Sequence, residues 1–196
     1  MRALVLLALI AGCGSNIPKY DYAGEVDPRN KEVVLGVGDV VAINVWGEGN
    51  KDLNTEATIR PDGTITMPLV GDLKAGGETP TSLKASINAK LVNFVKVQGS
   101  EITVALKTWR SYRFTVQGEV VKTGVFSTDQ YVTVADAIAL AGGPTRFARR
   151  DGVILTRFDA KSKETKRIPF DYDSVASGKR PDMNIFVLPG DTIYIP

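Results

Sequence analysis

Five acidic residues come nearest, by type and spacing, to a catalytic arrangement in this sequence. They lie between positions 48 and 72: Glu48, Asp52, Glu56, Asp62 and Asp72. Two carboxylates cleave a glycosidic bond when they flank it at a separation of about 5–9.5 Å. Nothing in the spacing indicates that geometry, and Asp62 precedes a glycine, where aspartate commonly bonds its own backbone in a turn. We therefore expect no catalytic residues and no enzymatic activity.

The composition limits other kinds of chemistry. The 196 residues include no histidine and one cysteine, Cys13. Zinc sites draw mainly on cysteine and histidine, and nucleophilic triads need a histidine base. A formal net charge of +2 is too small to indicate nucleic-acid binding. We expect no metal, no cofactor, no nucleic-acid partner and no disulfide within the chain.

The single cysteine ends an N-terminal apolar run. Arg2 precedes residues 3–11, which are continuously apolar but too few to span a membrane, as is typical of a secretory signal. Residues 10–13, Ile-Ala-Gly-Cys, resemble the bacterial lipobox, whose cysteine is lipidated and becomes the first residue of the mature chain. We interpret residues 1–12 as a lipoprotein signal peptide and Cys13 as a membrane anchor. The alternative is a buried cysteine at the end of a hydrophobic helix.

Residues 13–32 are polar and contain Pro18 and Pro28, so we interpret them as an extended tether between the lipid and the fold. In lipoproteins of enteric bacteria the residue after the cysteine guides sorting. Gly14 at that position favours the outer membrane.

The first folded unit is expected over residues 33–110. Residues 40–46 are apolar on both faces and predict a buried strand. Asp62-Gly63 between alternating segments predicts a hairpin of residues 57–60 with 64–67, which residues 70–75 extend. Thr79-Pro80 is a favourable helix start, and the helix carries an apolar stripe. The stripe comprises Leu83, Ile87, Leu91 and Phe94. A half-buried strand over residues 102–107 completes the unit.

The second unit is expected over residues 111–196. Strands are predicted near residues 113–117, 125–126, 153–155, 167–170, 185–188 and 192–195. Thr133 and Asp136 form a helix-start pattern, and Gly142-Gly143-Pro144 ends that helix. One helix against a curved sheet is typical of a β-grasp-like domain, so the fold class is α+β. A Gly-Asp turn before a strand occurs in both units, at Asp39 and Asp191.

These motifs, in this order, resemble a known family. Residues 35–91 are similar to the polysaccharide export domain, with a Gly-Asp turn before Ile43-Asn44-Val45-Trp46-Gly47, and Arg60-Pro61-Asp62-Gly63 later. Residues 112–195 resemble the soluble-ligand-binding β-grasp domain, through Val116-Gln117-Gly118-Glu119-Val120 and Pro189-Gly190-Asp191.

The resemblance implies a function. Family members are outer-membrane lipoproteins of Gram-negative bacteria that stack as homo-oligomeric rings and guide capsule or exopolysaccharide through the periplasm. They dock on an inner-membrane polysaccharide co-polymerase. Larger members end in a helix that crosses the outer membrane. No such segment follows Cys13 here, so we expect no transmembrane domain in the mature chain and a separate outer-membrane β-barrel protein as the pore. The alternatives are a monomeric periplasmic lipoprotein that binds a ligand or peptidoglycan, and a polysaccharide-modifying enzyme.

Basic residues are concentrated near the end of the chain. Residues 146–167 contain eight basic and three acidic residues, and the basic ones include Arg146, Arg149, Arg150 and Arg157. One interpretation is a solvated hairpin. The other is a contact with a neighbouring subunit, a partner or an anionic polymer. Trp46, Trp109 and Tyr112 flank predicted core strands, so we expect them to be buried rather than to stack on sugars.

Overall fold

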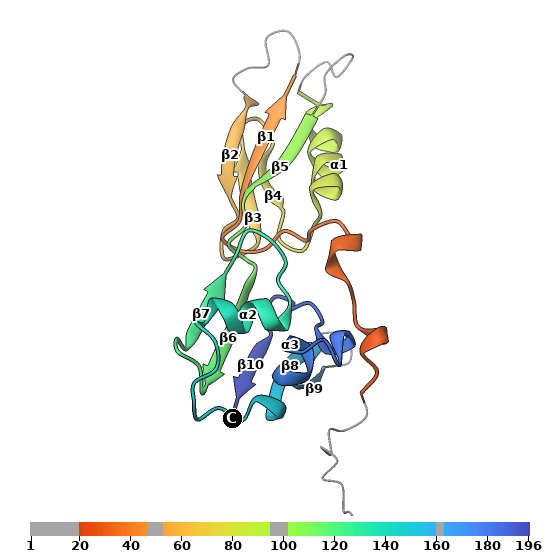
Figure 1. Cartoon of the computed structure of the whole chain (residues 1–196). Helices are drawn as coiled ribbons and strands as arrows, with labels where there is room; N and C mark the ends of the chain where they lie inside the picture. The colour runs from red at the N-terminus through yellow and green to blue at the C-terminus, as the bar shows by residue number, and fades with distance from the viewer. Residues whose placement is uncertain (1–19, 47–52, 95–101, 160–162) are drawn as a thin grey trace, which may run out of the picture.

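The computed structural model describes residues 20–46, 53–94, 102–159 and 163–196. The chain forms two α+β units that lie end to end, each with its own hydrophobic core (Figure 1). Residues 20–30 run beside the second unit before the chain enters the first. The predicted α+β class is confirmed.

The first unit contains two small sheets and one long helix. Its elements are β1 (Val40–Val45), β2 (Thr55–Thr58), β3 (Thr64–Met67), β4 (Gly71–Lys74), α1 (Pro80–Leu91) and β5 (Ile102–Thr108). One antiparallel sheet has the order β2-β1-β5, and the other pairs β3 with β4. Buried and half-buried residues alternate along β1, so only one of its faces lies in the core. The prediction of a strand buried on both faces is therefore wrong.

The helix α1 begins where the sequence predicts. The Thr79 hydroxyl accepts from the Ser82 backbone N–H at 3.2 Å, and the Thr79 N–H donates to the Ser82 hydroxyl at 2.9 Å. These bonds satisfy donors that a helix start leaves without partners. Leu83, Ile87 and Leu91 are buried, as a stripe at this spacing predicts. Phe94 lies beyond the helix and is 59% exposed, so its assignment to the stripe is wrong.

The hairpin predicted across Asp62-Gly63 is wrong in its pairing. The tight turn is present, because Gly63 N–H donates to Arg60 C=O at 2.8 Å and Arg60 N–H donates to Thr64 C=O at 2.9 Å. However, β2 pairs with β1, and β3 pairs with β4. The chain leaves the hairpin path at Ile59, whose backbone bonds the turn before β1 instead.

The second unit is a five-stranded sheet with helices on one face. Its elements are β6 (Arg113–Gly118), β7 (Gly124–Ser127), α2 (Val134–Leu140), β8 (Val153–Asp159), β9 (Glu164–Phe170), α3 (Tyr172–Ala176) and β10 (Thr192–Ile195), with 3₁₀ turns at Arg150–Gly152 and Pro181–Met183. The strand order is β7-β6-β10-β8-β9, and β10 lies parallel to β6. The strand predicted over residues 185–188 is only a bridge between Thr133 and Phe186, and α3 is not predicted by the sequence.

The predicted ends of α2 are confirmed. The Thr133 hydroxyl and the Asp136 carboxylate exchange bonds with each other's backbone N–H groups. Gly142 and Gly143 follow the helix with φ of 85° and 83°, a left-handed conformation that glycine adopts without steric cost.

The aromatic residues around the junction of the two units are packed together. Tyr112 is fully buried, and its ring stacks on the half-buried Trp109 at 4.7 Å between centroids. Tyr131 meets Trp109 edge-on at 4.8 Å. The prediction of buried packing is thus confirmed for Tyr112 and partly for Trp109. Trp46 is 67% exposed at the end of β1, so the same prediction is wrong for it.

The tether predicted over residues 13–32 is wrong for its described part. Residues 20–30 form two short 3₁₀ turns, Tyr22–Gly24 and Pro28–Asn30, against the second unit. The Tyr22 ring is buried in the second core, and its hydroxyl donates to Pro169 C=O at 2.7 Å. The segment is polar on average, but a few of its side chains, such as Tyr22, pack against the second unit. Residues 13–19 lie outside the described residues.

Among the described residues, no helix combines the length and the apolar character needed to cross a bilayer.

Candidate functional site

Three of the five acidic residues considered as catalytic candidates are described by the structure, and each of them forms an ion pair with a basic side chain. Glu56 pairs with Lys107, with 2.5 Å between Oε1 and Nζ. Asp62 and Asp72 both approach Arg60, at 3.7 and 3.0 Å. Glu48 and Asp52 lie outside the described residues.

The pKa values of Asp62 and Asp72 are shifted in the direction opposite to that of a glycosidase general acid. Hydrogen bonds from Thr64 lower the pKa of Asp62, and hydrogen bonds from Thr66 and Arg60 lower the pKa of Asp72. A general acid for glycoside cleavage needs a raised pKa so that it holds a proton near neutral pH. Among the described residues, no three potential metal ligands gather in one place.

The two Gly-Asp turns bury their carboxylates completely. Asp39 and Asp191 are 0% and 1% exposed. Each accepts a bond from the backbone N–H three residues earlier: Gly36 to Asp39 at 2.8 Å, and Leu188 to Asp191 at 2.7 Å. The predicted self-bonding of the turn is confirmed. Each carboxylate has further partners far away in the sequence, which the motif alone does not indicate.

Asp39 joins the two units. Its carboxylate accepts from the Arg110 and Ser111 backbone N–H groups at 2.8 and 2.7 Å, and from the Ser111 hydroxyl at 2.8 Å. A Cβ on Gly36 would lie 2.4 Å from Ser111 Cβ, so only glycine permits this close approach. The connection between the units is therefore a defined, hydrogen-bonded joint.

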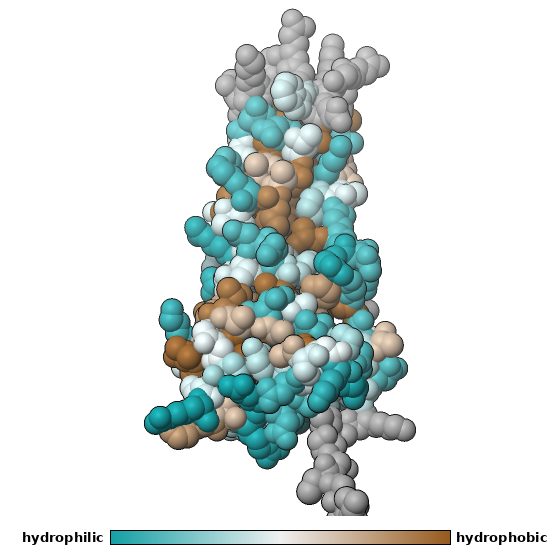
Figure 2. All heavy atoms as spheres, in the orientation of Figure 1, coloured by the Kyte–Doolittle hydropathy of each residue, from teal (hydrophilic) through white to brown (hydrophobic). Residues whose placement is uncertain are grey.

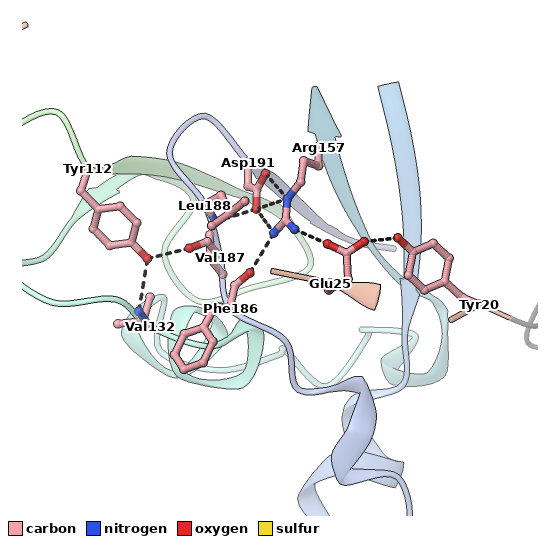
Figure 3. A network of polar contacts seen from close by, with 9 residues as sticks. All are labelled: Tyr20, Glu25, Tyr112, Val132, Arg157, Phe186, Val187, Leu188 and Asp191. Carbon is pink, nitrogen blue, oxygen red and sulfur yellow. Dashed lines mark hydrogen bonds and ion pairs between the residues drawn. The ribbon is translucent and has the colours of Figure 1, made fainter. Parts of the chain in front are cut away.

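Asp191 belongs to a buried ionic cluster centred on Arg157 (Figure 3). Arg157 bonds Asp191 through Nε and Nη2, at 3.0 and 2.6 Å, and Glu25 through Nη1 at 2.5 Å. Nη2 also donates to Phe186 C=O at 2.8 Å. The side chains of Arg157, Glu25 and Asp191 are 9%, 9% and 2% exposed. One cation thus links β8, the loop before β10 and the N-terminal segment.

Protonation in this cluster favours the charged guanidinium. Burial alone lowers the pKa of Arg157, but the hydrogen bonds and charge of Asp191, with the charge of Glu25, raise it above its ordinary value overall. Burial and the hydrogen bond to Glu25 raise the pKa of Tyr20, so its phenol remains a donor to that carboxylate. The cluster is a structural clamp with no unpaired nucleophile or base.

The structure separates the four candidate contact arginines into two groups. Arg146, Arg149 and Arg150, here called the basic loop, are exposed before β8. Arg149 lies 3.4 Å from Asp151, Arg150 lies 3.7 Å from Asp173, and the guanidinium of Arg146 covers the exposed Phe147 ring. These guanidinium groups remain accessible.

Arg157 is not accessible, so its assignment to a surface contact is wrong. Residues 153, 155 and 157 lie on the same, inward face of β8. The alternation is visible in the sequence, since Val153, Leu155 and Arg157 are two residues apart. The clamp cannot be recognised from the sequence, because its two acids come from segments more than thirty residues away from Arg157.

A shallow groove opens beside α2. Its volume is about 470 Å³, and its lining consists of Thr128, Gln130, Tyr131, Val132, Asp136, Ala139 and Leu140. The helix lies in front of β6 and β7 in Figure 1, and Figure 2 shows hydrophobic residues between polar ones on this side. The only charged residue in the lining is acidic, and Leu140 is 46% exposed.

Two family profiles match the chain in succession. That of the polysaccharide biosynthesis/export proteins matches residues 27–107, and that of the SLBB domain matches residues 113–171. The chain therefore carries a polysaccharide biosynthesis/export domain followed by an SLBB domain. The first match coincides with the first unit together with part of the N-terminal segment, and the second covers β6 to β9. The structure extends the SLBB sheet to β10.

Several curated proteins are similar to this chain. The capsule polysaccharide export protein BexD of Haemophilus influenzae is 26% identical over 194 residues, covering 89% of this chain and 47% of the relative. The exopolysaccharide production protein ExoF of Rhizobium meliloti is 28% identical, covering 73% and 33%. The EPS I polysaccharide export outer membrane protein EpsA of Ralstonia solanacearum is 26% identical, covering 56% and 34%. The chain spans about half or less of the length of these relatives.

Proposed function

We propose that this chain is a lipid-anchored periplasmic subunit of a machine that exports capsule or exopolysaccharide in a Gram-negative bacterium. It forms a homo-oligomeric ring that guides polymer from an inner-membrane co-polymerase towards an outer-membrane pore. The observation that carries the proposal is the succession of export and SLBB matches over two units joined at Asp39. The names of its relatives, which are capsule and exopolysaccharide export proteins, support it.

Deletion of the gene tests this function directly. We expect surface polysaccharide to disappear and polymer to accumulate inside the cell, and the wild-type gene to restore export. The polymer should be chemically unchanged, since the proposed role is transport. Normal export without the gene would contradict the proposal, and polymer of altered structure at the surface would favour a modifying enzyme.

The N-terminal segment supports an orientation relative to the anchor. Only six residues separate Cys13 from Tyr20, so the lipid would lie within about 25 Å of Tyr20. The neighbouring Tyr22 is buried in the second unit. In our proposal the SLBB unit therefore lies next to the membrane, and the export unit points away from it.

Lipidation at Cys13 is testable by fatty-acid labelling in a Gram-negative host. We expect wild-type protein to incorporate label and to lose residues 1–12, because lipid attachment precedes cleavage in this class of protein. The variant Cys13→Ala should incorporate none and keep its leader, whereas the control Ser15→Ala should behave like wild type. Mass spectrometry of the N-terminus provides the measurement. Unlabelled wild-type protein that retains Met1 would rule out the anchor.

The basic loop is proposed as a contact with a neighbouring subunit or partner. The double variant Arg149→Glu with Arg150→Glu reverses two exposed charges. If the loop meets an acidic surface, the protein concentration needed for assembly should rise about tenfold. Native mass spectrometry of full-length protein in detergent measures this. The control Lys74→Glu with Lys84→Glu makes the same charge change on the first unit. Unchanged assembly would exclude the subunit contact and leave a polymer or another protein as the partner.

A further inference from the structure

The sheet of the second unit has two contrasting faces. Its inner face carries buried residues of all the central strands, such as Val116, Leu155 and Ile193, beneath α2. The outer face is defined by the residues that alternate with these. Strand register aligns them in two rows: Val125, Thr115, Thr192, Thr156 and Arg167, then Gln117, Tyr194, Ile154 and Pro169.

All residues in these rows are exposed or half-buried, so no described element covers the outer face. Large apolar side chains nevertheless stand on it. Val125 and Tyr194 are 67% and 43% exposed, and Phe158, which continues the face along β8, is 63% exposed. Thr115, Thr192 and Thr156 lie between these side chains, so the outer face is a mixed surface of apolar and polar residues, as most non-obligate interfaces are.

Charge on the outer face has one sign. Arg167 lies in the first row, and Arg113 lies on the same face of β6, opposite Ser127. Neither row contains an acidic residue. The α2 groove on the other side of the sheet is the reverse, since Asp136 is its only charged lining residue and the exposed Asp129 adjoins it. The two surfaces are therefore complementary in charge, since the outer face is basic and the α2 groove is acidic. Both surfaces also expose apolar side chains.

We propose that the outer sheet face of one copy docks on the α2 groove of the next copy. This inference rests on the ring proposed above and assigns it a subunit contact that does not include the basic loop. Because the two surfaces lie on opposite sides of one sheet, the contact is head-to-tail, which is the arrangement that generates a ring when it closes. Phe158 and Tyr194 lose their exposure against the groove lined by Tyr131 and Leu140. Arg167 approaches the acids there.

Charge variants on each surface test the inference. The sheet variant combines Phe158→Glu and Arg167→Glu, and the groove variant is Leu140→Lys. All three side chains are exposed, so the fold should persist, which thermal unfolding by circular dichroism checks. Each variant alone should assemble about tenfold more weakly than wild type, because like charges then oppose one another. The control Lys84→Glu on α1 should assemble normally.

Mixing the two variants shows whether the contact is head-to-tail. The sheet variant keeps an intact groove, and the groove variant keeps an intact sheet face. The mixture of full-length chains in detergent should therefore form heterodimers, which native mass spectrometry identifies by mass. Absence of heterodimers would overturn the inference, and so would normal assembly of both variants while wild type still forms rings. A wild type that stays monomeric at every concentration would overturn the proposed ring itself.

Discussion

Replacing Arg157 by methionine should destabilise the chain by about 3–5 kcal/mol, the usual cost of breaking a buried ion pair by removing one partner. Methionine has similar length but leaves the Asp191 and Glu25 carboxylates without their cation. Asp191 is the more severely affected, because it is 2% exposed and fixed in its turn by Leu188. Urea denaturation at neutral pH measures the change in the free energy of unfolding.

The control for Arg157→Met is the same substitution at Arg180. Arg180 also pairs with an aspartate, Asp182, at 2.7 Å, but the two side chains are 46% and 50% exposed. Exposed pairs contribute about 0–1 kcal/mol, so Arg180→Met should have little effect. Equal effects at the two positions would contradict the assignment of a buried clamp.

The Arg157 variant should also release the N-terminal segment. Glu25 is the cluster member on that segment, and its pairing with Arg157 is lost. Residues 20–30 should then exchange amide hydrogens faster than in wild type, while the core strands of the first unit remain protected. Unchanged exchange in residues 20–30 would show that the buried Tyr22 alone holds the segment.

The second large effect is expected at the joint between the units. Asp39→Ala should cost about 3–5 kcal/mol, because three backbone N–H groups lose their acceptor and each unsatisfied buried donor costs about 1–3 kcal/mol. Asp39→Asn should cost somewhat less, since one side-chain oxygen still accepts. The free energy of unfolding and small-angle X-ray scattering are the measurements, the latter because a broken joint allows the two units to reorient.

Two further variants distinguish the effect of losing the joint between the units from the effect of losing an ordinary turn. Asp62→Ala removes a turn aspartate that bonds only Thr64 and approaches Arg60, and exposed bonds of this kind contribute about 1 kcal/mol. Gly36→Ala forces a methyl group against Ser111 and should loosen the joint while Asp39 is kept. Scattering curves of Asp39→Ala and Gly36→Ala that match wild type would show that other contacts hold the units together.

Local sequence patterns predicted the helix caps and the tight turns correctly. The hydroxyl caps at Thr79 and Thr133, the glycine end of α2 and the two Gly-Asp turns all depend on residues within four positions of one another. Such contacts form the same way wherever the segment lies. The family resemblance added the order of the two units, and the profile matches confirm it.

The wrong predictions have a different cause, because they concern contacts between distant parts of the chain. The turn at Asp62-Gly63 is real, but strand pairing depends on partners far along the chain, and β1 and β4 compete for the two segments. Trp46 ends a core strand and yet is exposed, because the strand has one buried face. The N-terminal segment looks like a tether by composition, and only the tertiary structure reveals that Tyr22 is buried.

The sequence by itself determined the α+β class, the start of α1, both ends of α2 and the succession of two units, because these follow from residue types and short spacings. Only the tertiary structure decided that Arg157 is a buried clamp instead of a surface contact, and that Asp39 joins the units. Both depend on backbone and side-chain groups 34 to 132 residues apart, which only folding brings within hydrogen-bonding distance.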